Sequence, residues 1–250
     1  MPTRLKLVGI EKNFGPIQIL NNLSLSVKNG EVLALLGDNG AGKSTLIKII
    51  AGIHQPSAGK IYWEGNELDH NNFSPQQARK LGIQTVYQHL GLVNQLSIAR
   101  NFFLGCEPIK SLGPLTWLDQ NFMRETVFKE LKNMGLKRKL DPNDNVSKLS
   151  GGERQAIAIA RARFFGAKLL ILDEPTSALS VGQTEAVLDY IKEAAISGIA
   201  VIFITHTLHH IERIVDNVVI LHRGHSVANF ERGNINLQQC ANLIMHGQLD

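Results

Sequence analysis

Apolar and polar side chains alternate in the first part of the chain, over residues 5–14 and 20–27. Alternation with a period of two predicts strands that bury one face. Gly15-Pro16 and Asn29-Gly30 supply turn signals after these two stretches. We therefore expect a small antiparallel sheet at the N-terminus.

Later apolar runs are continuous instead of alternating, which predicts strands buried on both faces. They are separated by helical patterns, and this alternation predicts an α/β fold with a mainly parallel sheet covered by helices. The predicted strands of this sheet are 32–36, 83–88, 169–172, 199–205 and 218–221, and the predicted helices include 45–51, 183–195, 208–213 and 236–246.

The pattern becomes helical between residues 89 and 163, with predicted helices at 98–104, 119–134 and 151–165. This stretch is expected to be an inserted helical subdomain. Residues 1–88 and 164–250 would then form an antiparallel β subdomain and an α/β core, all within one domain of 250 residues.

A glycine-rich turn joins the apolar strand 32–36 to the helix 45–51. Unpaired N–H groups and the positive end of a helix dipole make such a turn an anion site. The spacing is that of the phosphate loop, in which Lys43 reaches the outer phosphates and Ser44 ligates Mg²⁺. The predicted phosphate-binding residues are Gly37, Asp38, Asn39, Gly40, Ala41, Gly42, Lys43, Ser44 and Thr45.

Two carboxylates, Asp173 and Glu174, directly follow the apolar strand 169–172. A core does not tolerate them unless they project from the carboxyl edge of the sheet, where the phosphate loop is also expected. Asp173 would then hold Mg²⁺, and Glu174 would orient or deprotonate the water that attacks a γ-phosphate.

A second helix start of this kind follows at Ser150-Gly151-Gly152, which leads into the helix 155–165. Such a turn exposes another set of N-terminal amides. An ordinary N-cap is the alternative interpretation.

Together these motifs resemble the nucleotide-binding subunits of ATP-binding-cassette (ABC) transporters, in the family's own order. The fold implied is a P-loop NTPase with a RecA-like core. The matching motifs are the Walker A loop 37–45, the Q-loop glutamine Gln88, the signature 149–153, the Walker B strand 170–174, the D-loop 177–180 and the switch histidine His206; Phe14 matches the aromatic residue that stacks on adenine, although a core aromatic residue is its alternative.

The resemblance implies an ATPase that binds ATP and Mg²⁺ between two head-to-tail copies of the chain. Ser150, Gly151 and Gly152 of one copy would cover the γ-phosphate bound by the other. The implied catalytic residues are Glu174, His206 and Gln88, and the implied metal ligands are Ser44, Gln88 and Asp173.

Three positions depart from the family pattern. Glu153 stands where the signature usually has Gln, and Ser180 where the D-loop commonly has Asp. His89 follows the Q-loop glutamine where an acidic residue is common. We expect Glu153 to be tolerated, Ser180 to bear on coupling between the two sites, and His89 to concern the partner contact.

The finer pattern, including 86–88, 97–105 and 205–210, most resembles ribose- and fructose-type sugar importers. No apolar run approaches the roughly 20 residues of a membrane span. The expected partners are thus a second copy, an integral membrane permease and, indirectly, a sugar-binding protein. The expected location is cytoplasmic, peripheral on the inner face of the cell membrane.

The net charge of +4 is scattered, so no nucleic-acid partner is expected. Two alternatives stay open: an importer ATPase for a solute other than a sugar, and a soluble cassette ATPase acting on ribosomes or DNA. A further interpretation is a regulatory module without turnover. The last would lack Glu174 or His206, and both are present.

Overall fold

The largest sheet has six strands in the order β12-β11-β3-β10-β9-β6. Every neighbouring pair is parallel except β11–β12, so the expectation of a mainly parallel sheet is confirmed. All residues of β3 and β10 are buried, as expected for strands covered on both faces. The strands are β3 (Val32–Gly37), β6 (Ile83–Val86), β9 (Leu169–Asp173), β10 (Ala200–Ile204), β11 (Asn217–His222) and β12 (His225–Glu231).

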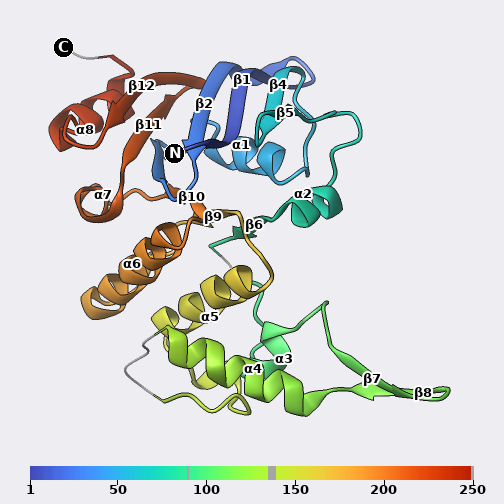
Figure 1. Cartoon of the computed structure of the whole chain (residues 1–250). Coiled ribbons are helices and arrows are strands. Elements are labelled where there is room, and N and C mark those ends of the chain that lie inside the picture. Colours follow the sequence, from blue (N-terminus) through green and yellow to red (C-terminus); the bar gives the residue numbers. More distant parts are fainter. Residues whose placement is uncertain (89, 135–138, 249–250) are drawn as a thin grey trace. The chain divides into compact units, whose positions relative to one another are not determined.

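A second, antiparallel sheet has the order β2-β1-β4-β5. Helix α1 (Lys43–Ile50) contacts β2 of this sheet, beside which it lies in Figure 1, and also β3 of the large sheet. Its buried residues therefore join both sheets in one hydrophobic core. The strands are β1 (Thr3–Phe14), β2 (Ile17–Lys28), β4 (Ala58–Trp63) and β5 (Asn66–Glu67).

The remaining helices on this part of the chain are α2 (Pro75–Leu81), α7 (His209–Ile214) and α8 (Leu237–His246). Ser74 caps α2 through a capping box with Gln77, as its Ser-Pro start predicts. Helix α8 contacts β11 and β3.

Strand β12 was not predicted from the sequence. It pairs with β11 through a hairpin whose turn residues Arg223 and Gly224 both have positive φ, 46° and 83°. Two positive φ values are typical of a type I′ turn, which is the turn that matches the twist of paired strands. The Arg-Gly pair was therefore the overlooked signal.

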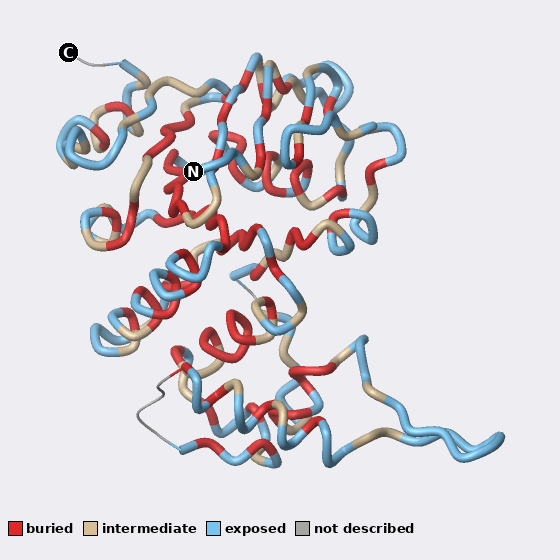
Figure 2. Tube along the Cα trace, in the orientation of Figure 1, coloured by how far each residue is buried: buried red, intermediate tan, exposed pale blue. Residues whose placement is uncertain are grey.

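The helical stretch contains α3 (Ile98–Phe102), α4 (Gln120–Asn133), the short 3₁₀ helix η1 (Val146–Lys148) and α5 (Gly151–Phe164). The prediction of helices alone was wrong here. Strands β7 (Ile109–Leu112) and β8 (Leu115–Leu118) form a hairpin around Gly113-Pro114, because two short runs of β-forming residues flank that turn signal. Most of the hairpin is exposed (Figure 2).

The computed structural model describes residues 1–88, 90–134 and 139–248. The chain folds as two units: 1–88, 167–175 and 191–250 form the first, and 89–166 with 176–190 form the second. Helix α6 (Val181–Ile196) runs from the second unit into the first. In the described ranges, no helix is both long and apolar enough to cross a bilayer.

Candidate functional site

Four neighbouring parallel strands of the first unit end at the same edge of the large sheet. In the order β3, β10, β9 and β6, they are followed by the glycine-rich loop, His206, Glu174 and Gln88. The register aligns these ends, since Ile204 pairs with both Leu35 and Asp173. The carboxyl edge of a parallel sheet is where ligands bind in open α/β folds.

An open cavity of about 370 Å³ lies at this edge. Most of the residues predicted for the phosphate and metal site line it, so the structure brings together side chains that are far apart in sequence. The lining residues are Ile19, Asp38, Asn39, Gly40, Gly42, Lys43, Ser44, Thr45, Gln88, Asp173, Glu174 and His206.

The three glycines of the loop serve different purposes. A Cβ on Gly37 would lie 2.5 Å from the carbonyl oxygen of Leu221, and one on Gly42 would lie 2.6 Å from Leu20. These two glycines therefore allow β11 and β2 to approach the loop closely. Gly40 has open space around it but a φ of +82°, so only backbone freedom is needed there.

The N-terminus of α1 has no internal cap. Its N-cap residue is Gly42 in the left-handed conformation, no side chain bonds the first amides, and the first turn carries no acidic residue. The first N–H groups of a helix lack acceptors inside the helix. A phosphate group fits here because it would satisfy these donors at the positive end of the helix dipole.

Lys43 is only 8% exposed, and its ammonium donates hydrogen bonds to the carbonyl oxygens of Gly37 (2.7 Å) and Asp38 (3.0 Å). Burial lowers the pKa of Lys43, although the charges of Glu174, Asp38 and Asp173 act in the opposite direction. The lysine is thus held over the loop by the loop's own backbone.

Asp173 is the last residue of β9, and Glu174 follows it with a positive φ of 49°. The N–H of Glu174 donates to the carbonyl of Ile204 at the end of β10. This left-handed conformation costs roughly 1–2 kcal/mol for a non-glycine residue and is typical of functional sites. His206 Nε2 lies 2.5 Å from Glu174 Oε1, so the two predicted catalytic groups are in contact.

The same edge fits a divalent cation. The hydroxyl of Ser44, the amide of Gln88 and the carboxylate of Asp173 all line the cavity, and oxygen ligands of this kind suit Mg²⁺. Burial, and after it the charge of Glu174, raises the pKa of Asp173, although Lys43 and His206 lower it. A cation would offset the cost of keeping two neighbouring carboxylates charged. The described residues contain no cluster of three His, Cys, Asp or Glu side chains suited to a metal.

Phe14, predicted to stack on adenine, ends β1 and is 44% exposed, so it is not a core aromatic residue. It pairs with Ile17 on β2, two residues before Ile19, which lines the cavity. Two strand residues span roughly 7 Å. Phe14 therefore lies close to the cavity along the strand and is not among the residues that line it.

The second predicted anion site lies in the other unit, at the start of α5. Ser150 Oγ accepts from the N–H of Glu153, and the Glu153 carboxylate accepts from the N–H of Ser150 at 2.8 Å. This capping box satisfies two amide donors that the sequence interpretation left open for phosphate.

The glycines of this turn are also required by packing. A Cβ on Gly151 would lie 2.5 Å from Leu179, and one on Gly152 would lie 3.0 Å from Gln183. The predicted D-loop region and the start of α6 thus pack directly on the turn. Ser180 takes part in this arrangement, since its N–H donates to Gln183 Oε1.

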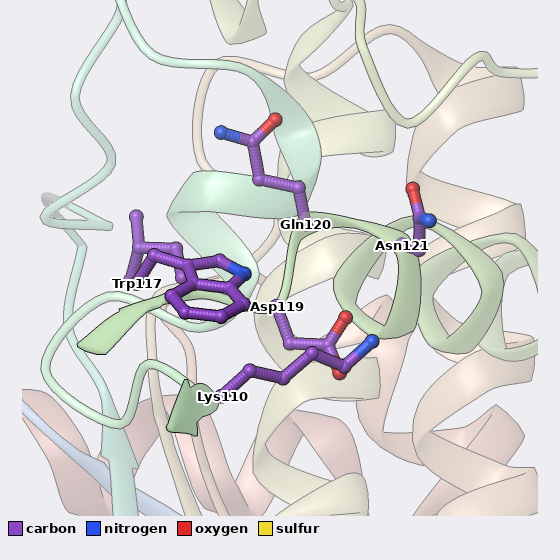
Figure 3. Close-up of a pocket in the computed structure, with 6 residues that line it drawn as sticks. Lys110, Trp117, Asp119, Gln120 and Asn121 are labelled. Carbon is purple, nitrogen blue, oxygen red and sulfur yellow. The ribbon is translucent and has the colours of Figure 1, made fainter. Parts of the chain in front are cut away.

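A separate cavity of about 450 Å³ lies at the base of the β7–β8 hairpin (Figure 3). Trp117 and Lys110 line it together with polar residues at the start of α4, and Lys110 forms an ion pair with Asp119. None of these residues was predicted to be functional. Sequence reasoning also missed Ile19, which lines the cavity at the sheet edge.

The expectation that His89 concerns the partner contact falls on a residue outside the described ranges.

Comparison with known proteins decides the family. A family model described as ABC transporter matches residues 20–177. The chain belongs to the ABC transporter family. The arrangement at the sheet edge is accordingly that of an ATP-binding cassette, and the predicted P-loop NTPase fold is confirmed.

The cassette is similar over nearly its full length to curated relatives. It is 40% identical to the xylose/arabinose import ATP-binding protein XylG of Sulfolobus acidocaldarius, over 96% of this chain and 92% of the relative. It is 41% identical to the fructose import ATP-binding protein FrcA of Rhizobium meliloti, over 85% and 82%. Against the ribose import ATP-binding protein RbsA of Caldanaerobacter subterraneus it is 35% identical over 98% of its length, but spans only 48% of that relative.

Solved structures support the same fold. An ATP-binding cassette of an ABC transporter in its ADP conformation has a TM-score of 0.80 at 24% identity, covering 98% of this chain and 96% of that one. A bacterial ABC transporter cassette solved as a dimer has a TM-score of 0.73 at 25% identity, covering 91% and 98%.

Proposed function

We propose that this cassette is the ATP-hydrolysing subunit that energises import of a sugar through a separate membrane permease. The observation that carries the proposal is the single cavity where Lys43, Glu174 and His206 meet at the ends of parallel strands. The names of the relatives, which include xylose/arabinose, fructose and ribose import, support the sugar.

The phosphate chain of ATP would bind to the open N-terminus of α1. Lys43 contacts the outer phosphates, and its lowered pKa reflects a buried cation that an anion stabilises. Ser44, Asp173 and Gln88 would hold Mg²⁺, which neutralises charge on the phosphates when bound. Phe14 stacks on the adenine ring.

Glu174 orients or deprotonates the attacking water. His206 contacts the γ-phosphate and, through its 2.5 Å contact with Glu174, fixes the position of that carboxylate. Gln88 reports on the γ-phosphate and water to the segment that follows it. The γ-phosphate bond of ATP would therefore be cleaved at the ends of β9 and β10, which carry Glu174 and His206.

The working state is a dimer of two copies in head-to-tail orientation. Ser150, Gly151 and Gly152 of one copy cover the γ-phosphate bound to the loop of the other, which explains why one chain carries two anion-binding turns. The dimer would bind a permease at the inner face of the cell membrane, and a sugar-binding protein would deliver the cargo to that permease.

Replacing Glu174 by Gln tests the catalytic assignment. The variant should bind ATP, lose hydrolysis and accumulate as an ATP-bound dimer in size-exclusion chromatography. Glu67→Gln is a matched control, because Glu67 of β5 forms an exposed ion pair with Lys60 of β4. Unchanged turnover in Glu174→Gln would contradict the role given to this carboxylate.

The alternatives differ in what stimulates the ATPase. Vesicles that contain the permease and a loaded sugar-binding protein should raise turnover. Stimulation by ribosomes or DNA, without a response to the permease, would favour a soluble cassette. Stimulation only by a binding protein that is loaded with another solute would show that the cassette serves an importer whose cargo is not a sugar.

A further inference from the structure

The exposed ring of Phe14 is held from two sides. The ammonium of Lys12 lies 4.9 Å from the ring centroid, over one face. The imidazole of His54 packs against the ring in a T-shaped arrangement, with centroids 5.4 Å apart and planes at 76°. The ring is therefore contacted by a cation over one face and by a second ring at a steep angle, while 44% of the residue remains exposed to a ligand.

Lys12 is itself fixed in place. Its ammonium donates to the carbonyl oxygen of Gln55 at 2.7 Å, in the loop that follows α1. The neighbouring N–H of Asn13 donates to Ser57 Oγ at 3.0 Å, and the N–H of Ser57 donates to the carbonyl of Glu11 at 2.7 Å. Three hydrogen bonds thus tie the end of β1 to residues 55–57.

The same loop is bonded to α1 at its other end. The N–H groups of Ile53 and His54 both donate to the carbonyl of Lys48, at 2.8 and 3.1 Å. Residues 53–57 therefore connect the ring of Phe14 to the helix whose N-terminus carries the phosphate loop. The two ends of a bound nucleotide would be held at a fixed separation by this short bonded segment.

We propose that Lys12 and His54 are positioning residues for the nucleobase: they fix Phe14 as a platform that selects nucleoside triphosphates over base-free polyphosphates. This inference rests on the proposed function. A cation on one face of the ring draws π-electron density toward itself, so the ring as a whole becomes less electron-rich and stacks better on an electron-rich purine.

The size of the effect follows from each contact. Stacking of a base on an aromatic side chain is worth roughly a five- to hundredfold change in affinity. A cation–π contact at an exposed site is worth about two- to fivefold. Lys12→Met keeps the length of the side chain and removes its charge. It should weaken Mg²⁺-ATP binding by about two- to fivefold.

The test is equilibrium binding of ADP and of inorganic tripolyphosphate by isothermal titration calorimetry, together with KM and kcat for ATP. Lys12→Met should weaken ADP binding and raise KM, with a smaller change in kcat, and should leave tripolyphosphate affinity unaltered. Lys12→Arg should restore ADP affinity because guanidinium also stacks on aromatic faces. Lys60→Met is the matched control, since Lys60 lies on the neighbouring strand β4 and forms an exposed ion pair with Glu67 of β5.

A double-mutant cycle separates positioning from general structural damage. Phe14→Leu removes the ring, so adding Lys12→Met to it should cost no further ADP affinity. Additive losses, or an equal loss of tripolyphosphate affinity in Lys12→Met, would overturn the inference. His54→Ala should give a smaller loss that also requires Phe14.

Failure of the proposed function would look different. If the unmodified chain bound neither ATP nor tripolyphosphate, the nucleotide site itself would be wrong. If it bound and hydrolysed ATP while Lys12→Met bound ADP normally, only the positioning role would be wrong.

Discussion

Helices α1 and α5 both begin at glycine-rich turns, but their N-termini are completed in opposite ways. At α1 no side chain caps the first amides, and Lys43 adds a buried positive charge. At α5 the side chains of Ser150 and Glu153 cap each other's backbone, and Glu153 adds a negative charge. The first turn depends on an external anion, whereas the second is largely satisfied by its own residues.

This difference assigns different tasks to the two turns. An uncapped helix start beside a buried lysine stabilises a bound phosphate strongly and by itself. A capped start retains only part of its donors for a ligand. We infer that the α1 turn determines whether ATP binds, while the α5 turn adds a weaker contact that matters when two copies meet.

The largest expected effect follows from changing the α1 turn. Lys43→Met should weaken ATP binding on the order of a hundredfold, because charge-assisted hydrogen bonds to phosphate are lost. Calorimetric titration of ATP measures the change. Affinity within a few-fold of the unmodified chain would show that the open helix start alone holds the phosphates.

A matched pair of substitutions tests the α5 turn. Ser150→Asp and Ser150→Asn both provide good N-caps, so both should leave the melting temperature of the chain nearly unchanged. Asp adds a negative charge where a γ-phosphate is expected, and Asn does not. Ser150→Asp should lower ATPase activity about tenfold or more relative to Ser150→Asn. Equal activity of the two variants would remove this turn from the site.

Two carboxylates, Asp173 at the end of β9 and Asp119 at the start of α4, should change the stability of the chain with pH in opposite directions. Burial and Glu174 raise the pKa of Asp173, so its charge destabilises the chain above that pKa, and the cost disappears as the pH falls through it. Asp119 caps α4, and its bond from the Phe122 N–H lowers its pKa, so its charge stabilises the chain until the pH falls through that lowered value.

Without Mg²⁺ and nucleotide, Asp173→Asn should therefore raise the melting temperature at pH 7, and the gain should shrink in acid. Asp119→Asn should lower the melting temperature slightly at the same pH. Thermal melts from pH 3 to pH 8 measure both. A loss of stability in Asp173→Asn at pH 7 would show that this carboxylate is satisfied inside the chain.

The smallest expected effect concerns Glu153. Glu153→Gln keeps the capping box and removes one negative charge beside the α5 turn. We compare the double variant Glu153→Gln/Glu174→Gln with Glu174→Gln alone. In the presence of ATP, the dissociation constant of the dimer should fall by about two- to fivefold at low salt, and by less at high salt. Association that is unchanged at low salt would show that this charge does not reach the bound phosphate.

Most of the site was predictable because it depends on local patterns joined by one topological rule. The glycine-rich loop, Asp173-Glu174 and His206 each follow a recognisable buried strand, and parallel strands bring their carboxyl ends together. Ser150 and Glu153 also carried the spacing of a capping box, so the self-capped state could have been read from the chain.

Other features depend on contacts that sequence spacing does not encode. Lys12 and Phe14 lie two residues apart on one strand, which hinted at a shared face, but His54 reaches the ring only through the fold of the loop after α1. The requirement for glycine at positions 37 and 151 arises from Leu221 and Leu179, which are distant in sequence. The β7–β8 hairpin was missed because the helical pattern around it dominated the interpretation.

The central claim is that the open turn of one copy and the capped turn of another complete a single site. Mixing two impaired variants, Lys43→Met and Ser150→Asp, tests it most directly. In a mixed dimer the first variant supplies an intact α5 turn and the second an intact α1 turn, so one complete site forms. We predict ATPase activity in the mixture well above the sum of the two separate variants. Activity that never exceeds that sum would contradict a site shared between copies.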